Sequence, residues 1–213
     1  MNHVELSKAT YVLEEEQAPA CLLSLDGCIV YCNPAWDAYA RENGGDPGAL
    51  GRTVTGKPFR SFIMGEEVRN AVSIYMGLAL RGEPASFLSE CNSPEVGRVI
   101  MNRFEPVRSS RSRLTVGAAA VYSLVRSYAI SELHAPHPVQ DDLYRDRDGL
   151  IHMCAFCRRV QRRGQDGGWD YVPEYVKSRD ETIVQTCCGS CYAQLIEEEV
   201  RGAPSRFRTR VAH

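Results

Sequence analysis

Four cysteines near the C-terminus have the spacing of a metal site. Cys154 and Cys157 form one Cys-x-x-Cys pair, and Cys188 and Cys191 form a second pair further along the chain. Two sulfur atoms separated by two residues can reach the same ion, and two such pairs complete a tetrahedron with metal–sulfur distances of about 2.3 Å. Four thiolates leave no coordination position for water, so the pattern predicts a structural zinc ion rather than a catalytic one.

Two alternatives concern the same cysteines. An iron–sulfur cluster also takes four cysteines, whereas two separate redox dithiols would need a neighbouring βαβ pattern that the sequence does not display. Cys187 could replace Cys188 as a ligand, but the two-residue spacing to Cys191 favours Cys188. The total of nine cysteines is odd, which argues against a complete disulfide framework.

A group of arginines follows the first cysteine pair, and it allows two interpretations. Beside a zinc site, such a group could hold nucleic-acid phosphates. It could also be a solvated face that offsets nearby acids and the negative charge of the thiolates. No aromatic residues alternate with the arginines, which favours the second interpretation. The group consists of Arg158, Arg159, Arg162 and Arg163.

The composition excludes several classes of protein. The chain has 213 residues, of which 44% are hydrophobic and 24% charged, and its net charge is −2. These values exclude an intrinsically disordered chain and give no global attraction for nucleic acid or an anionic membrane. No segment approaches the roughly 18 apolar residues of a membrane helix. The N-terminus is polar and acidic, unlike a signal peptide, so we expect a cytoplasmic protein without membrane partners.

The elements that must position these residues follow from periodicity and turn signals. We expect five antiparallel strands with intervening helices, which is an α+β domain. Asp26-Gly27 predicts a hairpin turn, and Asn33-Pro34 predicts the start of a helix. The expected helices are 4–16, from 33 to about 44, and 66–81; the expected strands are 20–25, 28–32, 84–91, 97–107 and 113–125, with 46–64 irregular.

A second, smaller unit follows. Residues 134–148 are rich in proline and aspartate, which predicts a linker. Residues 149–205 contain both cysteine pairs and a helix expected from Tyr192 to Val200. A unit of this size buries little hydrophobic core of its own and needs an additional stabilising element, which the bound metal would supply. Residues 206–213 are expected to be a flexible tail.

Three motifs of the first unit resemble the PAS family. They are SLDGCIVYCNPAW (24–36), CNSPEVGRVIMNRFEPVR (91–108) and AISE (129–132). The resemblance implies a PAS-like sensor domain over 18–133, preceded by an N-terminal helix over 1–17. Its fold would be a five-stranded antiparallel sheet with flanking helices that enclose a pocket. Ala129 stands where the family often has aspartate, and no cysteine lies near Gly51, which argues against covalent flavin photochemistry.

The pocket of such a domain would be lined by apolar residues of the strands and of the longest helix. The alternative for these residues is that they only fill the core, and the sequence names no ligand. The candidates are Leu23, Tyr31, Tyr75 and Met101.

The second unit also resembles a known element. The segment from Met153 to Val176, followed by TCCGSCYAQL (186–195), is similar to a short C-terminal extension of bacterial sensory proteins. Trp169 and the Glu174-Tyr175-Val176 segment match that pattern, while Gly189 replaces a proline. The resemblance implies a small four-cysteine module of the zinc-ribbon or treble-clef type.

Together these features predict a non-catalytic bacterial signalling protein. Its PAS-like domain would sense a ligand or a redox state, or mediate dimerisation, and would pass the signal to a protein partner through the zinc module. The N-terminal helix would pack in a homodimer. One alternative is a nucleic-acid-binding transcriptional regulator that uses the zinc module and the arginines. Another is a thiol redox switch that releases zinc. No catalytic triad, paired carboxylates or open metal site indicates an enzyme.

Overall fold

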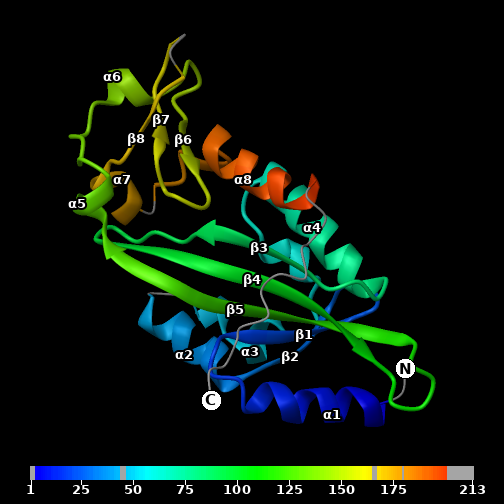
Figure 1. Ribbon diagram of the computed structural model, residues 1–213. Helices are drawn as coiled ribbons and strands as arrows, with labels where there is room; N and C mark the ends of the chain where they lie inside the picture. Colours follow the sequence, from blue (N-terminus) through cyan, green and yellow to red (C-terminus); the bar gives the residue numbers. More distant parts are fainter. Residues whose placement is uncertain (1–2, 44–46, 165–166, 179, 201–213) are drawn as a thin grey trace, which may run out of the picture.

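Two β-sheets organise the part of the chain that the computed structural model describes, residues 3–43, 47–164, 167–178 and 180–200. The larger sheet is antiparallel and has the strand order β2-β1-β5-β4-β3 (Figure 1). The smaller sheet has the order β8-β7-β6-β9 and lies beyond one end of the larger one. The predicted α+β fold is therefore confirmed.

The larger sheet and its helices occupy the first 133 residues. In chain order the elements are α1 (His3–Glu14), β1 (Ala20–Ser24), β2 (Ile29–Cys32), α2 (Pro34–Glu42), η1 (Pro47–Ala49), α3 (Gly51–Val54), η2 (Phe59–Phe62), α4 (Glu66–Leu80), β3 (Ala85–Glu90), β4 (Val96–Arg108), β5 (Thr115–Ala129) and α5 (Ile130–Leu133).

Alternation along the strands gives the larger sheet two buried faces. Leu23 on β1 and Ala118 on β5 lie opposite each other and pack beneath α4, together with Phe104 of β4. Leu22 points to the other face, where it contacts a smaller cluster that includes Leu13 of α1. The inner face therefore carries the main core and helices α2–α4, and α1 covers the outer face (Figure 1).

Asn33 ties the hairpin to the helix before it. Its side-chain oxygen accepts hydrogen bonds from the backbone N–H groups of Trp36 (3.0 Å) and Ala20 (2.9 Å). Its side-chain amide donates to carbonyls at the end of α1, including that of Leu13 at 3.2 Å. Asn33 is therefore the predicted N-cap of α2, and it also fixes where α1 meets the sheet.

The segment 46–64, which was expected to be irregular, contains short helices in its described part. Gly51 is the first residue of α3, and a Cβ there would lie 2.9 Å from the Cβ of Cys32, so this close approach favours glycine. These single turns do not show the periodicity of a longer helix, which is why the sequence pattern did not indicate them.

The second unit begins earlier than expected. Its elements are α6 (Asp141–Tyr144), β6 (Ile151–Cys154), β7 (Val160–Gln161), β8 (Trp169–Asp170), α7 (Pro173–Lys177), β9 (Ile183–Thr186) and α8 (Gly189–Val200). Part of the predicted linker 134–148 is thus helical, because Tyr144 packs into the core of this unit. Helix α8 starts before Tyr192, and the predicted tail 206–213 lies outside the described residues.

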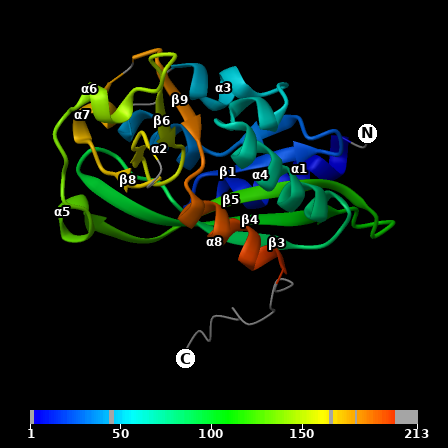
Figure 2. The ribbon, with the colours of Figure 1, turned by 90° about the horizontal axis from the view of Figure 1, so that it is seen from above.

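The second unit packs directly on the inner face of the first. Leu195 of α8 is 1% exposed and belongs to the main core beside α4. The hydroxyl of Tyr75 on α4 donates a hydrogen bond to the backbone carbonyl of Leu195. Figure 2 shows α8 lying alongside β3, and the two elements are in contact. The two units therefore share one hydrophobic core.

Among the described helices, none combines the length and the apolar character that crossing a membrane would require.

Candidate metal centre and adjoining cavity

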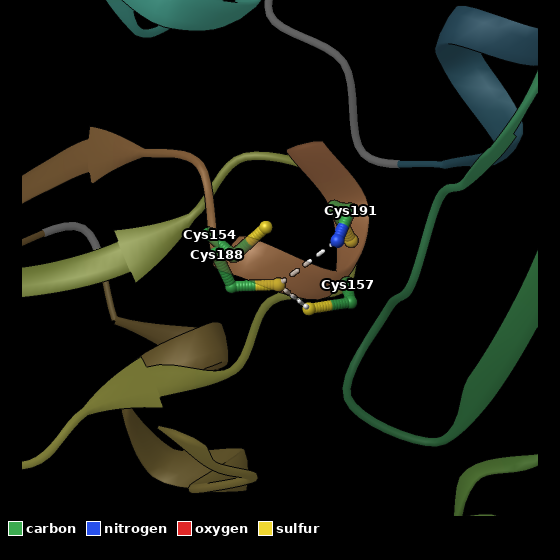
Figure 3. Close-up of side chains that lie close together, drawn as sticks. All are labelled: Cys154, Cys157, Cys188 and Cys191. Atoms are coloured by element: carbon green, nitrogen blue, oxygen red, sulfur yellow. Dashed lines mark hydrogen bonds between the residues drawn. The ribbon is translucent and has the colours of Figure 1, made fainter. Parts of the chain in front are cut away.

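The four cysteines of the two Cys-x-x-Cys pairs converge on one point (Figure 3). Their sulfur atoms all lie within 4.8 Å of one another, and all four residues are buried. A tetrahedral site with metal–sulfur distances of about 2.3 Å has sulfur–sulfur edges of about 3.8 Å. The sulfur atoms of Cys157 and Cys188 are 3.7 Å apart. The cluster can therefore hold a metal ion.

Local backbone structure places the first pair. Cys154 ends β6, and its backbone N–H donates to the carbonyl of Arg159 at 2.8 Å. Arg158 closes the turn with its N–H donating to the carbonyl of Cys154 at 3.0 Å, and it has a positive φ of 61°. This tight turn keeps Cys157 close to Cys154.

The second pair lies at the start of α8. Cys188 immediately precedes the helix, and Cys191 lies in its first turn. The backbone N–H of Cys191 donates to the sulfur of Cys188 at 3.5 Å. The early start of α8, which the sequence did not predict, is therefore what brings Cys191 to the cluster.

Arg159 supplies positive charge to the cluster. Its Nε donates to the sulfur of Cys157 at 3.2 Å, and a terminal nitrogen lies 3.7 Å from the sulfur of Cys188. Burial lowers the pKa of Arg159, but the hydrogen bond and the negative cysteines outweigh burial and raise that pKa above its ordinary value. Arg159 therefore offsets part of the charge that four thiolates carry.

Cys187 lies beside the cluster without belonging to it. Cys188 is 1% exposed and has its sulfur among the four, whereas Cys187 is only partly buried and packs against the group from outside. A hydrogen bond to Cys154 and burial raise the pKa of Cys187, which disfavours its thiolate. The geometry agrees with the spacing argument for Cys188.

Two of the other three arginines contact polar side chains of the second unit. Arg162 makes a bidentate ion pair with Asp170, and Arg158 donates to the side chain of Gln185 at 3.1 Å. As a whole residue, only Arg163 of the group of four is exposed, and the other three are half-buried. The second interpretation of the arginines, in which they offset thiolates and acids, therefore fits Arg159 and Arg162.

Asn92 joins the metal centre to the first unit, although it belongs to none of the predicted site residues. Its backbone N–H donates to the carbonyl of Phe156 at 3.3 Å, and its side-chain amide donates to the carbonyl of Cys157 at 3.1 Å. Asn92 is 5% exposed. The only sequence signal was its position in the Cys-Asn-Ser-Pro turn.

Two adjoining cavities lie between the inner face of the sheet and the loop of the first cysteine pair. Their volumes are about 570 and 390 Å³. The first is open toward Tyr39 and Cys91, and the second reaches the core residue Phe104. Six residues line both cavities, so the two are adjacent, and we refer to them as two parts of one sensor cavity. They are Trp36, Ala49, Phe62, Asn102, Tyr122 and Phe156.

The predicted pocket residues lie elsewhere. Leu23 and Tyr75 are buried in the main core and do not line these two cavities. Tyr31 contacts the cluster on the outer face, beneath α1. Met101 alternates with Ile100 and Asn102 on β4, so it points away from the cavities. Apolar character alone does not show which face of a strand meets the helices, so it does not identify the residues that line the cavities.

The cysteines of the larger sheet are poor candidates for redox chemistry. Cys21 and Cys32 lie opposite each other on β1 and β2. Burial raises the pKa of both thiols, to about 12 for Cys32. Raised pKa values keep these residues in the less reactive thiol form. All nine cysteines lie in the described part of the chain, and none of them forms a disulfide.

Among known proteins, solved structures of low sequence identity are similar to this chain. No family model and no curated protein matches the chain. The LOV protein of Rhodobacter sphaeroides is 15% identical over 59% of this chain and 69% of its own, with a TM-score of 0.42. The PAS domain of Bordetella pertussis BvgS is 16% identical over 58% and 88%, with a TM-score of 0.40. The Vibrio cholerae LuxR-type receptor VqmA is 12% identical over 57% and 51%, with a TM-score of 0.41.

The fold assignment rests on the sheet itself. Its five antiparallel strands carry helices on the inner face, as the sequence motifs predict. The first unit thus has a PAS-like fold, and the second unit adds a cluster of four buried cysteines that can hold a metal ion.

Proposed function

We propose that this chain is a non-catalytic signalling protein, in which a PAS-like sensor domain and a structural zinc module are conformationally coupled. A change in the sensor cavity alters the surface that the zinc module presents to a protein partner. The observation that carries this proposal is the shared core. Leu195 lies on α8, four residues after the metal-ligand candidate Cys191, and its side chain is buried in the core of the sensor domain. A shift of one unit therefore moves the other.

Zinc is the metal that the donor set favours. Four buried cysteines around a single point match a structural zinc site, with no position left for water or substrate. The nearby Arg159 reduces the net charge of such a site. An iron–sulfur cluster with four cysteines is the competing assignment, and a visible absorption spectrum separates the two.

The first experiment measures the metal content of the chain. The protein is purified under reducing conditions without added metal, and zinc and iron per chain are determined together with an absorption spectrum. About one zinc per chain and no visible bands are expected. Iron with visible bands would replace the zinc assignment. Absence of metal from reduced, folded protein would refute the role of the four cysteines as ligands.

The sensor is further proposed to act as a homodimer through α1. Tyr11 and Val12 on this helix are 65% and 69% exposed, although Leu13 beside them is buried against the sheet. Exposed apolar residues on a helix that covers a sheet are suited to a second copy of the same helix. Sedimentation analysis should give a dimer, and Val12→Glu should shift it toward monomer. A monomeric wild-type protein would refute this part.

A further inference from the structure

Phe156 occupies an unusual position between the metal centre and the sensor cavity. It is one of the two residues inside the first Cys-x-x-Cys pair. Its side chain packs against the cysteine cluster and also against the main core of the sensor. The same side chain lines both parts of the cavity. One aromatic ring therefore contacts the metal site on one side and the cavity on the other.

The chemistry of the cavity indicates what it would bind. The residues shared by its two parts are mainly aromatic, and Trp36 meets Tyr122 edge to face at 6.0 Å between ring centroids. The ring N–H of Trp36 is already used, since it donates to the carbonyl of Ala49 at 2.8 Å. The volume of each part, about 570 and 390 Å³, lies in the range of about 300 to 1,000 Å³ that is typical of ligand sites.

Among the six residues that line both parts of the cavity, two polar atoms are left for a ligand. Asn102 is 7% exposed, and its amide nitrogen donates to Ser89 Oγ at 2.8 Å and to backbone carbonyls. Within the described residues, neither its Oδ1 nor the hydroxyl of Tyr122 has a hydrogen-bond partner. An acceptor without a partner in the wall of a cavity favours a ligand that donates a hydrogen bond.

We propose that the cavity binds a neutral, mainly aromatic small molecule with one N–H or O–H donor, and that Phe156 couples this ligand to the metal site. The donor meets Asn102, and the ring system packs against Trp36 and Phe156. The inference rests on the proposed function, since it requires a metal at the four cysteines.

The coupling follows from the covalent position of Phe156. A bound metal fixes Cys154 and Cys157, which hold Phe156 against the cavity, and Asn92 fixes the carbonyls of Phe156 and Cys157 from the sensor side. Loss of the metal frees the loop, so the wall of the cavity is lost with it. By linkage, a ligand that packs against Phe156 must also retain the metal.

The test measures the rate of metal release from the full chain with and without a probe. The probe is N-phenyl-1-naphthylamine, which is neutral and aromatic, has one N–H and fluoresces in apolar sites. Metal transfer to a chromophoric chelator is followed by absorbance. If release requires opening of the loop and opening destroys the probe site, the probe slows release by a factor of 1 + [probe]/Kd. At ten times Kd that factor is about eleven, so a roughly tenfold slowing is expected.

Two variants separate coupling from simple stabilisation. Phe156→Ala should load metal and should lose the effect of the probe, with less than about a twofold change in release rate. Tyr192→Ala is the matched control, because Tyr192 is an aromatic residue next to Cys191, is 43% exposed and does not line either part of the cavity. It should behave like the wild type. If Phe156→Ala does not load metal, Phe156→Leu replaces it and should give a reduced effect.

The outcomes distinguish this inference from the proposed function. A chain that holds no metal would refute the metal assignment itself. A metal-loaded chain that does not bind the probe would refute the ligand class. Probe binding without slower metal release, or equal slowing in Phe156→Ala and wild type, would overturn the coupling while leaving the zinc module intact.

Discussion

Replacement of Arg159 by methionine tests whether the cysteine cluster holds a metal as charged thiolates. The guanidinium donates to the sulfur of Cys157 at 3.2 Å and lies 3.7 Å from the sulfur of Cys188. Methionine keeps the apolar stem that packs in this half-buried position but removes the charge and the donors. The variant should therefore fold and bind metal more weakly.

The size of the effect can be estimated from these contacts. A hydrogen bond to a charged group contributes about 1.5 to 3 kcal/mol, which corresponds to a factor of roughly 10 to 150 in an equilibrium constant. Loss of a residue that hydrogen-bonds a metal ligand typically weakens metal binding by about 10- to 100-fold. We therefore expect the zinc Kd of Arg159→Met to rise by about 10- to 100-fold. Arg159→Lys keeps the positive charge but loses the planar set of guanidinium donors. Its zinc Kd should lie between those of the wild type and Arg159→Met.

The assay is a competition titration of zinc against a chromophoric chelator, at constant pH and under reducing conditions. Arg163→Met is the matched control, because Arg163 belongs to the same arginine group but has an exposed side chain. Its Kd should stay within about twofold of the wild-type value. A Kd for Arg159→Met within twofold of wild type would refute the reasoning that Arg159 stabilises metal-bound thiolates.

Three further predictions concern the ligand set, the shared core and an ion pair. Cys188→Ser should abolish stoichiometric zinc binding, whereas Cys187→Ser should retain one zinc per chain. Metal analysis of both variants checks this, and the reverse result would make Cys187 the ligand in place of Cys188. Leu195→Ala should lower the free energy of unfolding by about 2 to 5 kcal/mol, because it leaves a cavity between α8 and the core of the sensor domain. Denaturant unfolding measures this free energy, and a change below about 0.5 kcal/mol would contradict the shared core. Burial raises the pKa of Asp170, but the hydrogen bonds from Arg162 and the other nearby donors outweigh it, so that the pKa is lowered in the folded protein. Its stabilisation is therefore present above the unfolded pKa of about 3.9 and is lost as the pH falls through the folded pKa. Asp170→Asn should make the protein less stable at neutral pH, with a smaller loss of stability on acidification; unfolding curves between about pH 7 and pH 3 test this, and parallel curves would contradict it.

Local patterns in the sequence predicted a large part of the fold. The Asp26-Gly27 hairpin, the Asn33 cap and the helix over 66–81 were all visible as short-range signals, and each is present within a few residues. The convergence of the four cysteines was also predictable, because Cys-x-x-Cys spacing constrains both sulfur atoms of a pair. These features depend on neighbours in the chain, so the chain alone specifies them.

Contacts between distant segments required the tertiary structure. The sequence placed residues 134–148 in a linker because proline and aspartate dominate there, yet Tyr144 packs into the core of the second unit. Tyr31 and Met101 do not line the two cavities, because alternation along a strand shows which residues share a face but not which face meets the helices.

The position of the metal loop against the sensor was likewise not in the sequence pattern. Asn92 and Phe156 are 64 residues apart in the chain, but a hydrogen bond of 3.3 Å joins their backbones. The sequence by itself determined that this protein has a PAS-like sheet and four cysteines with metal-ligand spacing. Only the tertiary structure decided that the cysteine loop forms a wall of the sensor cavity, because such packing depends on the shapes of two surfaces that no local pattern encodes.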